Sequence, residues 1–150
     1  MYVDESGFDT YIYREYARAR RGVKVPGAIS GKKFKRTNMV AGQNQGKIIA
    51  PLQYSGPTNS QLFELWFESV LLTAIAVGSV IVMDNASFHR KAVLRQIALT
   101  AGCRVIFLPP YSPDLNPIEF YWAWLKQKLR KIISDFPDFD SALFACFQGR

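Results

Sequence analysis

Runs of apolar residues and alternating apolar and polar positions predict five strands in this 150-residue chain. A turn at Ser6 and Gly7 ends the first strand, and glycine and amide side chains over residues 42–46 predict a hairpin between the second and third. The continuous apolar run over 79–83 is typical of a strand that is buried on both faces. The expected strands are residues 2–4, 37–41, 47–54, 79–83 and 104–108.

Apolar residues that recur at helical spacing predict four helices between and after these strands. Thr58 or Asn59 caps the first, Ser87 opens the second, and Gly102 ends it. The expected helices run from 58 to about 75, from 87 to about 98, from 117 to about 133, and from 139 to 147. Strands followed by strand–helix–strand crossovers predict one domain, an α/β mixed sheet of five strands with helices on both faces.

The chain carries a net charge of +7 and a pI near 9.6, which favours a polyanionic partner such as DNA. The positive charge is concentrated between residues 14 and 36, where Glu15 is the single acid. Glycines and Pro26 indicate that this segment is extended or looped, so we expect it to contact DNA; a solvated loop is the alternative. Its positive residues are Arg14, Arg18, Arg20, Arg21, Lys24, Lys32, Lys33, Lys35 and Arg36.

Several classes of protein are not supported by the sequence. The longest apolar stretch, residues 71–83, is shorter than the roughly 20 residues that a membrane-spanning helix needs, and residues 1–9 lack the pattern of a signal peptide. Cys103 and Cys146 lack metal-binding or disulfide-rich spacing and are expected to be small buried hydrophobic residues. We therefore expect a cytoplasmic protein, associated with the nucleoid when bound to DNA, without a membrane partner.

Three acidic residues are expected to meet beyond the carboxyl ends of the strands. Asp4 follows the first strand, Asp84 follows the fourth, and Glu119 enters from the helix after the fifth. Carboxylates are the ligands that Mg²⁺ prefers, with Mn²⁺ an alternative, and two such ions serve in-line displacement at phosphorus. We predict that these three residues are both metal ligands and catalytic residues.

Each acid also has a purely structural interpretation. Asp4 precedes Ser6 and Gly7 and can form an Asx-turn, while Asp84 can end its strand and lead into the next helix. Asn116 and Glu119 stand at the two ends of a capping box, with a proline at the first helical position. Spacing alone leaves the capping role of Glu119 open.

Two motifs resemble the mariner-like transposases of bacterial insertion sequences. One covers residues 82–89 (VMDNASFH), and the other covers 108–119 (LPPYSPDLNPIE). Residues 3–8 (VDESGF) look like the first-strand motif of that family. Thirty-four residues lie between Asp84 and Glu119, which matches the spacing of the mariner superfamily. The likeness extends over nearly the whole chain.

The resemblance implies a ribonuclease H-like fold and a two-metal Asp, Asp, Glu site for cut-and-paste DNA transposition. Water would nick the ends of the element, and the freed 3′-hydroxyl would then attack double-stranded target DNA, commonly at a TA dinucleotide. Supporting roles near the acids are expected for Asn85, His89 and Asn116. Trp122 is interpreted as a packing residue of the last long helix.

Relatives in this family carry a helix-turn-helix recognition domain ahead of the catalytic domain. The first acid lies at position 4, so residues 1–150 are interpreted as a catalytic domain without that module. This pattern favours the second frame of a split transposase gene, with an N-terminal recognition module or frameshift fusion partner, and a homodimer is a further expected assembly. Two alternatives remain open: another ribonuclease H-like nuclease, and an inactive DNA-binding transposase remnant.

Overall fold

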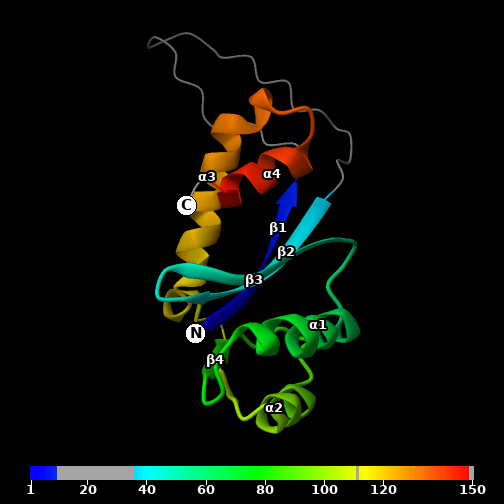
Figure 1. Ribbon diagram of the computed structural model, residues 1–150, viewed down its shortest axis with the longest axis vertical. Helices are drawn as coiled ribbons and strands as arrows, with labels where there is room; N and C mark the ends of the chain where they lie inside the picture. The colour runs from blue at the N-terminus through cyan, green and yellow to red at the C-terminus, as the bar shows by residue number, and fades with distance from the viewer. Residues whose placement is uncertain (10–35, 111, 149–150) are drawn as a thin grey trace.

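The computed structural model describes residues 1–9, 36–110 and 112–148 (Figure 1). Five strands form one sheet with the order β3-β2-β1-β4-β5. β1 is antiparallel to β2 and parallel to β4, and β4 is parallel to β5. The predicted mixed sheet with parallel late strands is therefore confirmed. The strands are β1 (Tyr2–Asp9), β2 (Arg36–Asn44), β3 (Lys47–Ser55), β4 (Val80–Met83) and β5 (Arg104–Phe107).

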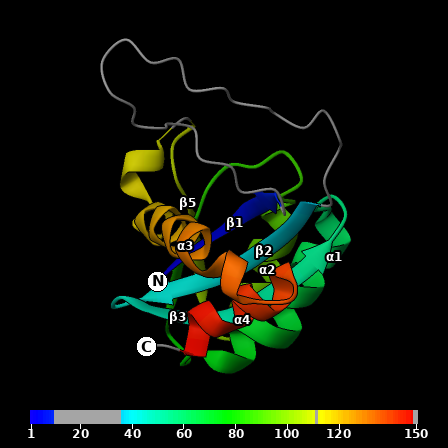
Figure 2. The ribbon, with the colours of Figure 1, turned by 90° about the horizontal axis from the view of Figure 1, so that it is seen from above.

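Helices cover both faces of the sheet, as predicted (Figure 2). α1 (Ser60–Trp66) continues through a π-helical turn, η1 (Phe67–Leu71), and a 3-10 turn, η2 (Leu72–Ala74), and packs with α2 (Lys91–Thr100) on one face. α3 (Ile118–Ile132) and α4 (Phe139–Gln148) cover the other. Short 3-10 turns, η3 (Pro113–Leu115) and η4 (Ile133–Asp135), flank α3.

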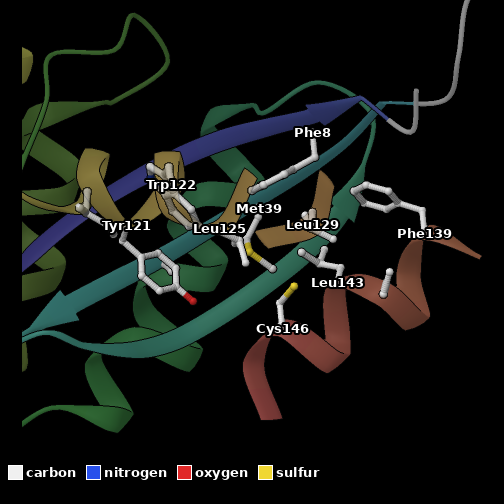
Figure 3. Packing of buried hydrophobic residues seen from close by; sticks show 12 residues of the cluster. Phe8, Met39, Tyr121, Trp122, Leu125, Leu129, Phe139, Leu143 and Cys146 are labelled. Carbon is white, nitrogen blue, oxygen red and sulfur yellow. The ribbon is translucent and has the colours of Figure 1, made fainter. Parts of the chain in front are cut away.

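Alternation along β1 divides the buried side chains between two cores. Phe8 faces α3 and α4, where it contacts Trp122 edge-on with ring centres 6.1 Å apart (Figure 3). Val3 faces the opposite way, toward α1 and α2. Because successive strand residues point to opposite faces, neighbouring residues of β1 serve different layers of the molecule. The two layers fix β1 in register from both sides.

The predicted turn at Ser6 and Gly7 is wrong, because β1 continues to Asp9. Its antiparallel pairing with β2 extends to the pair Asp9–Arg36, so both residues lie inside a ladder of backbone hydrogen bonds. The hairpin turn between β2 and β3 is also shorter than predicted. It is made by Gln45 and Gly46, which both have positive φ.

The second predicted helix begins later than expected, at Lys91 instead of Ser87. The Asp84 side chain accepts a hydrogen bond from the backbone N–H of Ala86 at 3.0 Å, and the Ser60 hydroxyl donates to the Phe88 carbonyl at 2.6 Å. These bonds satisfy backbone groups of the segment without a helix. Residues 84–90 therefore form a loop between β4 and α2.

Both cysteines are buried and free, which confirms their interpretation as small hydrophobic residues. The predicted cap of the first helix is confirmed for Asn59, whose side chain accepts a hydrogen bond from the N–H of Leu62 at 2.9 Å. Within the described ranges, every helix is too short or too polar to cross a bilayer.

Candidate active site

The carboxylates of Asp4 and Asp84 lie on neighbouring parallel strands. Tyr2 pairs with Val82 and Val3 with Met83, so the next residue of each strand is an aspartate. The sequence predicted that Asp4 follows the first strand, but Asp4 lies inside β1. β4 ends at Met83 while β1 continues along β2, so Asp4 is paired through its backbone with β2 at a point where β4 has already ended. The Asx-turn interpretation of Asp4 is therefore wrong.

Glu119 joins these two aspartates from the first turn of α3, and all three line one cleft of about 420 Å³. The cleft lies where β4 and β5 end, which is the edge of the sheet predicted from the sequence. The chain between β5 and α3 forms its opposite wall. The residues lining the cleft are Asp4, Asp84, Asn85, Ala86, Leu108, Pro109, Pro110, Ser112, Asn116 and Glu119.

Asp4 is the most buried of the three acids, with 7% of its surface exposed. Burial raises its pKa from 3.8 to about 8, and the negative charges of Glu5, Glu119 and Asp84 add to the increase. The indole N–H of Trp122 donates a 3.0 Å hydrogen bond to Oδ2 of Asp4. Without a cation, the cleft therefore favours the protonated form of Asp4.

Asp84 is held at the start of the loop after β4. Its Oδ1 accepts from the N–H of Ala86 at 3.0 Å and lies 3.3 Å from Nδ1 of His89. The same nitrogen lies 3.3 Å from the backbone oxygen of Asp84. The strand-ending interpretation of Asp84 thus describes its local bonds, and those same bonds orient its carboxylate at the edge of the cleft.

His89 connects Asp84 to Glu5, a residue that the sequence analysis missed. Nε2 of His89 lies 3.2 Å from Oε1 of Glu5. The imidazole is buried and its ring centre lies 4.4 Å from that of Phe63. Burial raises the pKa of Glu5. Burial also opposes the charged form of His89, but the hydrogen bond and charge of Glu5 outweigh it, so the pKa of His89 is raised.

Two overlapping sets of side chains offer metal ligands in this region. Asp4, Asp84 and Glu119 present carboxylates to the cleft. Ligand atoms of Glu5, Asp84 and His89 lie within 4.8 Å of one another. Asp4 and Glu5 belong to different sets, because successive strand residues point to opposite faces of the sheet. Asp84 is a member of both sets.

Asn85 and Asn116 also line the cleft, yet each has a buried side-chain oxygen without a hydrogen-bond partner among the described residues. The Asn85 amide donates to the carbonyl of Leu108 and so connects the two walls of the cleft. The capping-box interpretation of Glu119 is wrong. α3 begins at Ile118, its cap is Pro117 without a side-chain hydrogen bond, and Glu119 donates its N–H to the backbone oxygen of Asn116.

Trp122 has a second role that the sequence analysis missed. Its predicted packing is confirmed, since it is 1% exposed, but its indole nitrogen also holds Asp4. A signal was present: Trp122 follows Glu119 by three residues, so both lie on the same side of a helix. Glu5 directly follows Asp4 in β1 and therefore points to the opposite face, so no comparable signal indicated its pairing with His89.

The predicted DNA-binding residues Arg14 to Lys35 lie outside the described residues. Arg36 is described: it is the exposed first residue of β2. Its guanidinium lies directly beside Gly7, so a Cβ atom at position 7 would require the Arg36 side chain to shift. Gly7 thus leaves room for the Arg36 side chain.

Comparison with known proteins gives a family match over most of the chain. The profile of the family described as DDE superfamily endonuclease matches residues 1–141. A curated relative, the uncharacterized protein y4pE/y4sA of Sinorhizobium fredii (strain NBRC 101917 / NGR234), is 31% identical over 62 residues, which are 40% of this chain and 44% of the relative. The match thus spans less than half the length of that relative.

Solved structures of transposases and integrases share the fold. A Mos1 transposase paired-end complex with left transposon end matches 99% of this chain and 47% of its own, with a TM-score of 0.73 and 20% identity. The Mos1 mariner paired end complex with Mn matches 98% and 52%, with a TM-score of 0.65 and 15% identity. The catalytic core domain of BIV integrase matches 76% and 73%, with a TM-score of 0.52 and 17% identity. The ribonuclease H-like fold of these catalytic cores is therefore confirmed.

Proposed function

Because the chain belongs to the DDE superfamily of endonucleases, we propose that it cuts and rejoins DNA strands as the catalytic domain of a mariner-like transposase. The observation that carries this proposal is the meeting of Asp4, Asp84 and Glu119 in one cleft. They come from β1, from the loop after β4, and from α3, and 34 residues separate the last two acids. We assign the catalytic role to these three residues.

The donor set of the cleft fits divalent cations. Three carboxylates provide hard oxygen ligands of the kind that Mg²⁺ and Mn²⁺ take. Burial is the main cause of the raised pKa of Asp4, and the negative charges of Glu5, Glu119 and Asp84 raise it further. A bound cation would offset these negative charges. When bound, two such ions supply activation of the attacking oxygen and stabilisation of the leaving oxygen at phosphorus.

Residues around the acids fix where the carboxylate oxygens point. Trp122 uses one oxygen of Asp4, and Ala86 and His89 use one oxygen of Asp84. In each aspartate, the other oxygen takes part in none of these bonds. Glu119 is exposed at the start of α3, so its carboxylate can approach a ligand from the opposite wall. This arrangement orients the acids before substrate binds.

We propose double-stranded DNA as the substrate, cut at the ends of an element and joined to a target by cut-and-paste transfer. The fold is shared with Mos1 complexes that hold a transposon end. The present chain spans less than half of the length of that Mos1 chain. We propose that recognition of the element ends, use of a TA target and dimerisation belong to the complete assembly, in which an N-terminal recognition module or fusion partner would take part.

A cleavage assay with a branched or nicked DNA duplex tests the proposal. We expect cleavage that requires Mg²⁺ or Mn²⁺ and is lost in Asp84→Asn and Glu119→Gln. Glu68→Gln is the matched control, because Glu68 is an exposed acid of η1 outside the cleft. Circular dichroism checks that each variant folds, and calorimetric titration with Mn²⁺ checks that the two cleft variants lose affinity for the ion.

Two outcomes would replace this function with another. Faster cleavage of an RNA–DNA hybrid than of duplex DNA would indicate a different ribonuclease H-like nuclease. DNA binding with a steep salt dependence, but without cleavage under any metal condition, would indicate an inactive DNA-binding remnant.

A further inference from the structure

The segment between Asp84 and Asp114 contains four arginine or lysine residues and no acidic residue. One of them, Arg90, is neutralised: its Nε donates to Glu64 at 2.7 Å. Lys91 and Arg95 are exposed, and neither forms an ion pair with any acid in the described part of the chain. We call these two residues the α2 basic pair.

Both cations of the α2 basic pair lie over one aromatic ring. Nζ of Lys91 is 5.4 Å from the centre of the Phe107 ring, and the guanidinium carbon of Arg95 is 5.2 Å from it. The two residues are one helical turn apart on α2, so they point to the same side. Cation–π contacts hold flexible side chains in place, which lowers the entropy that a ligand must overcome to order them.

Phe107 places the α2 basic pair next to the acidic cleft. It is the last residue of β5, and the following residue, Leu108, lines the cleft. The ring centre of His89, which contacts Asp84, lies 6.5 Å from that of Phe107. Since each nucleotide of a duplex strand rises about 3.4 Å, these distances place both cations within about four nucleotides of His89.

Helix stability does not account for the position of Lys91. It is the first residue of α2, where the helix dipole disfavours positive charge, and the first turn contains no acid to offset it. A positive charge at this place is unfavourable for the free chain and favourable for a bound polyanion.

We propose that the α2 basic pair binds the phosphate backbone of the DNA strand that runs past the acidic cleft. The inference rests on the proposed function, which makes DNA the substrate of that cleft. The pair neutralises two phosphates beside the bond to be cut or joined, and it does so without reading base sequence. Its two residues, on α2, are distinct in sequence from the basic residues 14–36.

Binding of the full chain to a fluorescent 30-base-pair duplex in EDTA, followed by anisotropy over a range of salt concentrations, tests this inference. We expect Lys91→Ala/Arg95→Ala to lower the slope of log K against log salt by about 2 and the affinity at low salt on the order of tenfold. The charge-conserving swap Lys91→Arg/Arg95→Lys should restore both. The control is Arg130→Ala/Lys131→Ala, which removes the same two charges from the exposed last turn of α3.

An equal loss in the control variant, or an unchanged slope in Lys91→Ala/Arg95→Ala, would overturn the inference. A loss that the charge-conserving swap fails to restore would also overturn it, since it would indicate a packing role for the two side chains. Because the measurement uses no metal, Asp84→Asn should bind DNA with the wild-type slope. If the chain does not cleave DNA but Lys91→Ala/Arg95→Ala still lowers the salt slope, the result counts against the proposed catalytic function and still supports this binding site.

Discussion

Replacement of Asp4 by asparagine tests the electrostatic state of the cleft directly. Asp4 is buried beside Glu5, Glu119 and Asp84, and its pKa rises from 3.8 to about 8. An amide is neutral at every pH and its oxygen can still accept the hydrogen bond from Trp122. The variant therefore removes the titration of this site with little change in shape.

The sign and size of the effect follow from proton linkage. Because the folded-state pKa of Asp4 is raised, its contribution to stability is present below about pH 4 and is lost as pH rises toward 8. In the unfolded chain Asp4 ionises above its ordinary pKa of 3.8. For each pH unit between 3.8 and 7, the metal-free folded chain, in which Asp4 stays protonated, loses about 1.4 kcal/mol of its free energy of unfolding. Over the whole interval this cost is about 4 kcal/mol, so we expect Asp4→Asn to raise the free energy of unfolding at pH 7 by up to about 4 kcal/mol, and by almost nothing at pH 4.

Urea denaturation in EDTA, followed by tryptophan fluorescence from pH 4 to pH 8.5, measures this difference. Glu5 and His89 also have raised pKa values, but they titrate in both proteins, so the comparison cancels most of their effect. Addition of Mn²⁺ at about 100 times its dissociation constant should stabilise the wild type by about 2.7 kcal/mol. The asparagine variant should gain far less.

Parallel stability curves for the two proteins over the whole pH range would refute this reasoning. So would a variant that is less stable than the wild type at pH 8, because that result would show an ionised Asp4 with favourable partners in the folded chain. An equal gain from Mn²⁺ in both proteins would show that Asp4 does not contribute to the metal site.

Three further predictions concern the contacts around the acids. Trp122→Phe removes the hydrogen-bond donor to Asp4, so we expect the free energy of unfolding, measured by denaturation, to fall by about 2–3 kcal/mol. DNA cleavage should also become slower, and unchanged cleavage would contradict this prediction. Glu5→Gln removes the negative partner of His89, so the pKa of the imidazole should fall, as NMR titration of the single histidine would show; a constant pKa would contradict the pairing. Phe63→Ala removes a ring that is 1% exposed and should cost about 3–5 kcal/mol of unfolding free energy, whereas Leu65→Ala, at a residue that is 64% exposed, should cost much less.

Local sequence patterns predicted most of the fold correctly. Apolar periodicity gave the five strands and four helices in the right order, and the crossovers gave the parallel direction of the late strands, β4 and β5. The structure adds that β4 pairs with β1. The errors were at ends of elements. Ser6 and Gly7 have the composition of a turn, but their pairing with β2 keeps them in a strand. Ser87 resembles the start of a helix, but backbone groups of residues 84–90 form hydrogen bonds with the side chains of Asp84 and Ser60 instead.

The sequence by itself determined the order of strands and helices along the chain, because apolar periodicity is local, and it placed three acids at one edge of the sheet, because the carboxyl ends of parallel strands meet there. Only the tertiary structure decided that Asp4 lies inside β1 and that Glu5 points to the opposite face, toward His89. It also decided that Trp122 donates a hydrogen bond to Asp4 and that Lys91 and Arg95 both lie over the ring of Phe107. Contacts of this kind depend on how separate elements pack against one another. The periodicity of a single element predicts which of its faces is buried, but it does not predict which residues of another element that face contacts.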